Sequence, residues 1–224
     1  MAGFRIRPYR DADYDVVREM YVSGFSEHLN ALCVQALKQT WVQLVLVVFL
    51  LAAKAVSGSF LVSLMALIPL LVLAREGVRL LFNQQGIQLG LREDLLDIKA
   101  SYMQEGQVSC FWVAEIHGRL VGTVGLLPCR SHTGAWELKR ISVRKQFRRL
   151  GISKALCRTA LGFAACGGVR DVVLYTSMLQ TDAHKLYRSL GFHKIDEFVW
   201  PSLAAKLINF VVFKFGYKVQ QREA

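Results

Sequence analysis

The sequence has few of the features that indicate a metalloprotein or a disulfide-rich fold. It contains five cysteines, an odd number, and none of them stands at the spacing of metal ligands. The five histidines do not cluster along the chain either, so we expect buried thiols and no metal site. An internal repeat, a low-complexity tail and a proline-rich linker are also missing. The 224 residues therefore accommodate one domain and one inserted segment.

Acidic residues are scarce, with 17 against 28 lysines and arginines, which gives a formal net charge of +11. Such an excess of basic residues could bind nucleic acid or a histone tail, but no nucleic-acid motif and no aromatic stacking platform accompanies it. We therefore expect no nucleic acid as partner. The basic side chains suit phosphate groups and an anionic membrane surface better. The densest cluster consists of Lys139, Arg140, Arg144, Lys145, Arg148 and Arg149.

A polar N-terminus argues against a cleavable signal peptide, yet residues 41–74 are almost wholly apolar. As one helix they would extend about 51 Å, which is too long for a single crossing of a bilayer core of about 30 Å. We predict a helical hairpin over residues 30–83 that lies in a membrane and bends within residues 54–59. The alternatives are a single span with a detached N-terminal tail and a buried pair of soluble helices.

The flanking strands limit the topology of this hairpin. If residues 4–9 and 110–116 belong to one sheet, both lie on the same side of the membrane, so the apolar block crosses an even number of times or re-enters. Arg18, Lys38 and Arg75 flank the arms, whereas the bend carries only Lys54. The positive-inside rule then predicts that the folded domain faces the cytosol.

Residues 148–153, Arg-Arg-Leu-Gly-Ile-Ser, lie between an apolar strand pattern and an amphipathic helix pattern. The first N–H groups of a helix have no partner within it, and together with the helix dipole they form an anion site. Gly151 permits close approach of a phosphate, and Arg148 and Arg149 add positive charge. The pattern predicts a diphosphate-binding turn from strand to helix.

Further elements surround this turn. A buried strand over residues 172–176 and a helix over residues 183–190 follow it, with Gly191 as the stop signal. A β-hairpin is predicted from residue 110 to residue 125, with His117 and Gly118 in its turn. Towards the N-terminus we expect a strand over residues 4–9 and a helix from Asp13 to Tyr21. Near the C-terminus, residues 210–215 read as a last strand or as a membrane-contacting edge.

The turn, this order of elements and the phrase from Tyr187 to Phe192 resemble the GNAT acetyltransferase superfamily. The expected fold is α/β: a mixed central sheet flanked by helices, one domain over residues 1–224 interrupted by the hairpin. The apolar insertion and Ser109–Glu115 resemble the camello-type membrane-bound N-acetyltransferases, relatives of cysteine S-conjugate N-acetyltransferase. This resemblance implies acetyl-CoA as donor, a primary amine as acceptor and the endoplasmic reticulum membrane as location. A branch of that family acetylates protein lysines.

The resemblance also implies roles for individual residues. The CoA diphosphate would be held by the turn, and the pantetheine arm would pair with backbone groups of Ile141 and Val143. Tyr187 matches a tyrosine that protonates or stabilises the leaving thiolate, although a core aromatic would fit the same position. Glu137 is the best-placed candidate for the general base. The turn residues are Arg148, Arg149, Gly151 and Ser153.

The pKa of the acceptor amine distinguishes the candidate acceptors. Only a neutral amine attacks a thioester, and a lysine with a pKa of about 10.4 costs about 3 kcal/mol more to deprotonate at neutral pH than an α-amine with a pKa of about 8. We therefore expect the α-amine of a cysteine S-conjugate or a similar small amino acid derivative, with Arg140 or Arg130 binding its carboxylate. A histone or secretory-pathway lysine, and a degenerate domain that serves as a membrane adaptor, are the alternatives.

Overall fold

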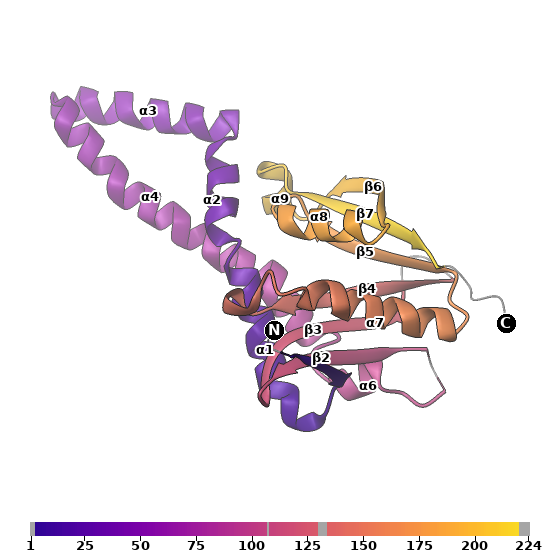
Figure 1. The fold of residues 1–224 in the computed structure, drawn as a ribbon. Helices are drawn as coiled ribbons and strands as arrows, with labels where there is room; N and C mark the ends of the chain where they lie inside the picture. The colour runs from indigo at the N-terminus through magenta and orange to yellow at the C-terminus, as the bar shows by residue number, and fades with distance from the viewer. Residues whose placement is uncertain (1–2, 107, 130–133, 220–224) are drawn as a thin grey trace.

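The computed structural model describes residues 3–106, 108–129 and 134–219, and its centre is a seven-stranded mixed sheet (Figure 1). The strand order is β1-β2-β3-β4-β5-β7-β6, and within the described chain only β4 and β5 run parallel. This confirms the expected α/β fold with a mixed sheet. The strands are β1 (Arg5–Pro8), β2 (Cys110–Ile116), β3 (Arg119–Pro128), β4 (Ala135–Val143), β5 (Asp171–Ser177), β6 (His193–Val199) and β7 (Val211–Lys218).

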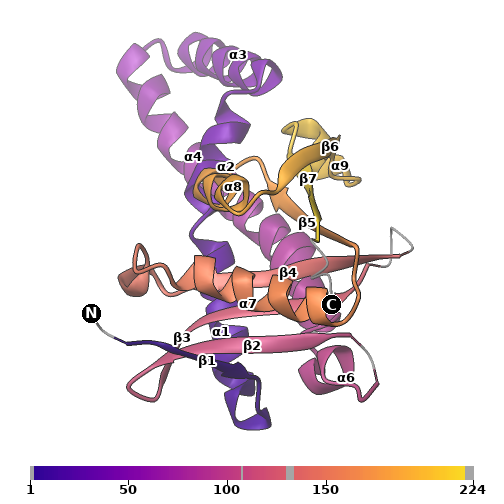
Figure 2. The same cartoon turned by 45° about the vertical axis from the view of Figure 1, so that its right-hand side comes forward.

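Helices cover both faces of the sheet, so a strand such as β2 buries side chains on both of its faces. On β2, Trp112 and Ala114 belong to the core beneath α7 (Ile152–Cys166), whereas Phe111 and Val113 belong to the core beneath α1 (Tyr14–Ser26). This alternation follows from the two-residue period of a strand. The second core also includes residues of α5 (Gln88–Arg92) and α6 (Ile98–Tyr102), while α8 (Thr181–Ser189) packs near β5 and β7 (Figure 2).

The N-terminal strand pairs as the topology argument requires. β1 lies antiparallel to β2, with Ile6 opposite Ala114. The prediction of a shared sheet is confirmed, and the alternative with a detached N-terminal tail is wrong. The β2–β3 turn at His117 and Gly118 and the stop at Gly191 are confirmed too, and both glycines have positive φ, 74° and 94°.

The position of β7 in the sheet distinguishes between the two readings of residues 210–215. β7 lies between β5 and β6 and pairs with both, and its Phe215 is fully buried. Residues 211–215 are therefore part of the sheet, and the reading as a membrane-contacting edge is wrong. Two short elements not specified by the sequence patterns, the 3₁₀ turns at Asp11–Asp13 and Lys145–Phe147, precede α1 and α7.

The apolar block forms two long helices that project from the domain (Figure 1). After α2 (Leu29–Leu37), α3 (Thr40–Ser57) and α4 (Phe60–Phe82) meet at Gly58, whose φ of 68° suits the left-handed region that glycine favours. Both helices are long and apolar enough to cross a membrane. The most apolar stretch of α3 has no buried residue, and that of the helix from Phe60 to Arg92 is only 6% buried, so the alternative of a buried soluble helix pair is wrong.

The second long helix continues into the domain. α4 passes through a π-helical turn (Asn83–Ile87) into α5, so one apolar, nearly continuous helix extends from Phe60 to Arg92. Two residues later, Asp94 is buried and accepts hydrogen bonds from Arg140 of β4 and from Tyr102. The helix from Phe60 to Arg92, which projects from the domain at its apolar end, is therefore anchored at its other end in the core beside β4.

Candidate functional site

β4 and β5 separate soon after they begin. Their parallel ladder consists of three residue pairs and ends at Glu137 and Val173. Each strand is held on its other side, β4 by β3 and β5 by β7 along Asp171–Ser177. The edge of β4 that faces β5 is therefore without a strand partner from Leu138 onward in the described structure. Backbone groups on such an edge need a hydrogen-bonding partner, either water or a ligand.

A bulge bends β4 within this separated part. The register with β3 shifts between Thr123 and Gly125, opposite Arg140, whose φ is 56°. A positive φ is uncommon for a residue with a side chain and costs energy. The conformation is held at both ends, because Thr123 Oγ1 donates to the Arg140 carbonyl at 2.8 Å and the Arg140 guanidinium pairs with Asp94.

The turn after β4 has the geometry of an anion site. Arg149 and Gly151 have φ values of 64° and 79°, and α7 begins at Ile152. No side chain caps this helix, and no acidic residue stands in its first turn. The free N–H groups at the start of α7 therefore remain available to an anionic ligand. The space beside Gly151 is open, with no atom within 4 Å of where a Cβ would lie.

The two arginines of the turn differ in their contacts. Arg148 donates to both carboxylate oxygens of Glu27 on α1's C-terminal side, at 2.7 and 2.8 Å, and to the Val143 carbonyl at 3.0 Å. Arg149 is exposed and forms no ion pair within the described ranges. Arg148 thus fastens the turn to the domain, whereas the charge of Arg149 is not neutralised by an ion pair in the part of the chain that the structure describes. Glu27 carries no sequence signal, because 121 residues separate it from Arg148.

Tyr187 lies on α8 with 4% of its surface exposed. Its ring packs near Phe192 and Phe215, with centroid distances of 6.0 and 6.1 Å. Burial raises the pKa of its hydroxyl far above the ordinary value, with the neighbouring Cys157 as a smaller cause. The hydroxyl is therefore protonated at neutral pH. It has no hydrogen-bond partner among the residues that the structure describes, so it can donate to a ligand.

Glu137 is the last residue of β4 that is paired with β5. Burial raises the pKa of its carboxyl, and Lys139 and Arg140 lower it by a smaller amount. The Lys139 ammonium lies 3.8 Å from the Glu137 carboxylate and 3.8 Å from that of Asp94. A buried carboxylate with a raised pKa is a better proton acceptor than an exposed one, which is what a general base requires.

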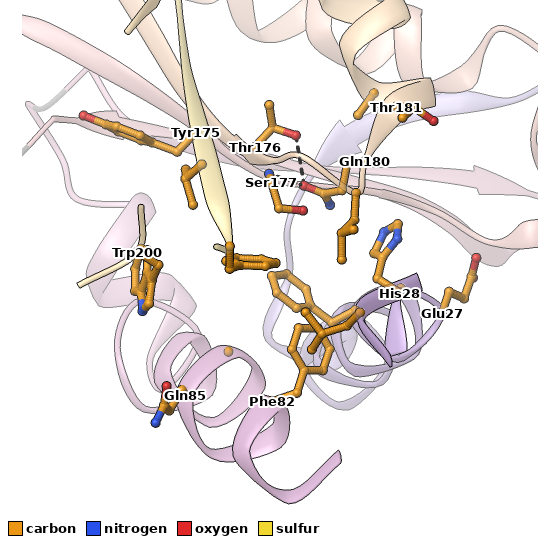
Figure 3. A pocket seen from close by; sticks show the side chains of 18 of the residues that line it. Glu27, His28, Phe82, Gln85, Tyr175, Thr176, Ser177, Gln180, Thr181 and Trp200 are labelled. Atoms are coloured by element: carbon orange, nitrogen blue, oxygen red, sulfur yellow. Dashed lines mark hydrogen bonds between the residues drawn. The ribbon is translucent and has the colours of Figure 1, made fainter. Parts of the chain in front are cut away.

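The residues predicted from the sequence to bind acetyl-CoA or to take part in catalysis line one cleft of about 1860 Å³, which also extends to the two long helices. They are Glu137, Ile141, Val143, Arg148, Arg149, Gly151, Ser153 and Tyr187. Further residues of the cleft had no sequence signal (Figure 3). His28, Thr176, Gln180 and Trp200 are among these, and Thr176 Oγ1 donates to Gln180 Oε1 at 2.9 Å.

Arg140, one of the two arginines suggested from the sequence to bind the acceptor's carboxylate, is already paired with Asp94. The Arg140 guanidinium is buried, forms a bidentate pair with Asp94 and lies over the Tyr21 ring at 4.8 Å. A Cβ at Gly90 would lie 2.6 Å from its Nη1 atom, so the helix that follows α4 closes around it. Arg140 therefore acts in the framework of the site, because its charge is already paired. Arg130 lies outside the described residues.

Comparisons with known proteins identify the family of the chain. The model of the acetyltransferase (GNAT) family matches residues 79–192. The "Probable N-acetyltransferase camello" of Xenopus tropicalis is 35% identical over 220 residues, 98% of this chain and 100% of that protein. Rat N-acetyltransferase 8 is 39% identical over 204 residues (88% and 89%), and human N-acetyltransferase 8B is 36% identical over 234 residues (100% and 99%).

Solved structures show the same fold at low sequence identity. A GNAT-family acetyltransferase from Staphylococcus aureus MU50 superposes with a TM-score of 0.59 at 17% identity, covering 97% of this chain and 100% of that one. An acetyltransferase from Streptococcus agalactiae gives 0.52 at 16% identity, covering 97% and 99%. Because the family model matches half of the chain and the relatives exceed 30% identity along most of it, the chain belongs to the camello group of GNAT acetyltransferases and is an acetyl-CoA-dependent N-acetyltransferase.

Proposed function

We propose that the protein acetylates the α-amine of a cysteine S-conjugate or a similar small amino acid derivative by direct attack on the thioester of acetyl-CoA. The observation that carries this proposal is the single cleft in which the turn before α7, the unpaired edge of β4, Tyr187 and Glu137 meet. That cleft offers an anion site, a strand edge, a proton donor and a proton acceptor, which an acyl transfer to an amine requires.

The donor occupies the side of the cleft formed by β4 and α7. The diphosphate lies against the N–H groups at the start of α7 and beside Arg149 and Ser153, while Arg148 holds the turn through Glu27. The pantetheine arm pairs with backbone groups of Ile141 and Val143 along the open edge of β4. This arrangement directs the thioester towards the bulge.

The chemistry needs two proton transfers. The neutral amine attacks the thioester carbonyl, a C–N bond forms, and the C–S bond breaks. Glu137 accepts the proton that the amine loses, and the Tyr187 hydroxyl donates a proton to the departing sulfur. The raised pKa makes Glu137 a stronger base, and the Tyr187 hydroxyl, which is protonated at neutral pH, is available as a hydrogen-bond donor to the departing sulfur.

The composition of the cleft supports this choice of acceptor. A lysine side chain costs about 3 kcal/mol more to deprotonate at neutral pH than an α-amine, so a single buried carboxylate suits the α-amine better. The cleft continues between aromatic residues of the β6–β7 region, such as Phe198, Trp200 and Phe210, and apolar residues of the two long helices. An S-substituent of large apolar area fits this part. Protein lysines remain the alternative acceptor, whereas a catalytically inactive adaptor has no support from the family assignment.

We place the two long helices in a membrane, as a hairpin that interrupts the single catalytic domain between residues 30 and 83. The exposed apolar surface of α3 and α4 supports this placement, since Val48 and Leu51 are 65% and 63% exposed. The basic residues near the arms favour a catalytic domain on the cytosolic side, and the relatives' family suggests the endoplasmic reticulum.

The acceptor can be tested directly with the purified protein in detergent. Incubation with acetyl-CoA and S-benzylcysteine, or with a lysine peptide whose N-terminus is blocked, is followed by mass spectrometry. We expect kcat/KM for S-benzylcysteine to exceed that for the peptide by at least about tenfold, equivalent to about 1.4 kcal/mol in the transition state. Faster acetylation of the peptide would contradict the proposed acceptor.

The anion site is tested by Gly151→Val. A side chain at φ 79° costs about 1–2 kcal/mol and shifts the start of α7 away from the diphosphate. We expect KM for acetyl-CoA to rise about tenfold. Gly118→Val is the matched control, because Gly118 also has a positive φ and open space beside it but lies in the β2–β3 turn. Equal KM changes in both variants would reject the assignment.

The proton donor is tested by Tyr187→Phe. The substitution keeps the packing on Phe192 and Phe215 and removes only the hydroxyl, so we expect kcat to fall by about 10²–10⁴-fold with KM nearly unchanged. Tyr217→Phe is the control, since the Tyr217 ring packs on Phe192 at 5.1 Å outside the cleft. Wild-type kcat in Tyr187→Phe would show that the ring has only a packing role.

The base is tested by the pH dependence of kcat at saturating substrates. Glu137 accepts a proton only when ionised, so activity is present above its raised pKa and is lost as the pH falls through it. Glu137→Gln should abolish this acid limb and lower kcat about 10²-fold. Glu105→Gln, at an exposed site, should keep the wild-type profile. An unchanged acid limb in Glu137→Gln assigns the proton transfer to another group.

A further inference from the structure

The short helix α9 (Leu203–Leu207), between β6 and β7, presents apolar side chains to the outside. Leu203 is 82% exposed and Leu207 is 57% exposed, whereas Ala205 is buried. The Ser202 hydroxyl accepts a hydrogen bond from the Ala205 N–H at 3.2 Å, so the helix has a defined start. Lys206 is exposed beside the leucines. This segment therefore combines apolar and basic surface.

Three side chains fasten α9 to α2 and to the start of α3. Trp41 Nε1 donates to the Leu207 carbonyl at 2.8 Å. Gln39 Nε2 and Gln35 Nε2 donate to the Ile208 carbonyl at 3.0 and 3.3 Å. The last carbonyls of a helix have no partner within it, and here α2 and the start of α3 provide the donors. The position of α9 relative to the start of α3 is thus fixed.

The start of α3 marks a boundary in polarity. Trp41 is the second residue of the apolar helix, and Lys38 precedes it by three positions. On α4, the basic Arg75 and Arg79 lie towards the domain end of the helix. Tryptophan and basic side chains gather where a membrane meets water. Residues bonded to Trp41 therefore lie at the depth of the lipid headgroups, where α9 stands beside α2 (Figure 1).

We propose that α9 is a second membrane contact, in which Leu203 and Leu207 enter the interfacial layer and Lys206 meets anionic headgroups. This inference rests on the proposed insertion of the α3–α4 hairpin. A lipid surface is favoured over a protein partner because α9 is hydrogen-bonded to the hairpin through Trp41 and because the protein carries a net charge of +11.

The contact has a consequence for the acceptor. Ala204, Ala205, Leu207 and Ile208 line the same cleft as Tyr187 and Gly151. With α9 in the headgroup layer, that side of the cleft opens at the membrane surface. An acceptor with an amine head and an apolar substituent would reach the thioester from the interface.

The test uses the full-length protein in nanodiscs of phosphatidylcholine containing phosphatidylserine. Cys33 and Cys166, which are at least partly exposed, are replaced by serine, and a nitroxide is attached to Leu203→Cys. Leu96→Cys is the matched control, because Leu96 is 60% exposed in the segment before α6, away from α9. Val48→Cys, in the middle of α3, reports on the hairpin itself. Collisions with oxygen, which concentrates in lipid, are compared with those of a water-soluble nickel chelate.

We expect the labels at positions 203 and 48 to collide more with oxygen and the label at position 96 to collide more with the nickel chelate. If position 48 prefers oxygen but position 203 behaves like position 96, the hairpin is inserted and the proposal for α9 is wrong. If both positions 48 and 203 prefer the chelate, the membrane insertion itself is wrong. The outcomes thus separate the two proposals.

Discussion

The early separation of β4 from β5 is the constraint on which the site depends. Two parallel strands that stayed paired would bury the edge of β4 and leave no place for an extended ligand. Here the ladder ends at Glu137, and the strands keep their order because β3 and β7 hold their outer edges. The unpaired N–H and C=O groups of β4 then need polar partners, and a pantetheine arm with its amide groups can supply them.

The bulge and the turn at the end of β4 complete this arrangement through ion pairs that join distant segments. Asp94 fixes Arg140 in the bulge, and Glu27 fixes Arg148 in the turn. In each case a carboxylate from the first half of the chain secures a basic residue of β4 or the turn after it. Breaking a buried pair leaves an uncompensated charge and costs about 3–5 kcal/mol, so the Asp94–Arg140 pair contributes strongly to the geometry.

The long helices are connected to the same framework. α4 runs without a break in helical character into α5, and Gly90 of α5 touches Arg140 and Tyr21. α3 is joined to α9 through Trp41. The two arms of the hairpin are therefore connected to different parts of the cleft lining, α4 through α5 to Arg140 and α3 through Trp41 to α9. A membrane that holds the arms would also hold the cleft.

The sequence by itself determined the order of the elements, the two apolar helices and the turn at Gly151, because these depend on local periodicity and on backbone freedom. The motifs of the family also pointed to eight of the residues that line the cleft, although most of its lining carries no such motif. The sequence could not show that Arg140 is paired with Asp94, that Arg148 is paired with Glu27, or that α9 is bonded to Trp41. Those contacts join residues 46 to 166 positions apart, and only the packing of the sheet against its helices decides which distant charges and carbonyls meet.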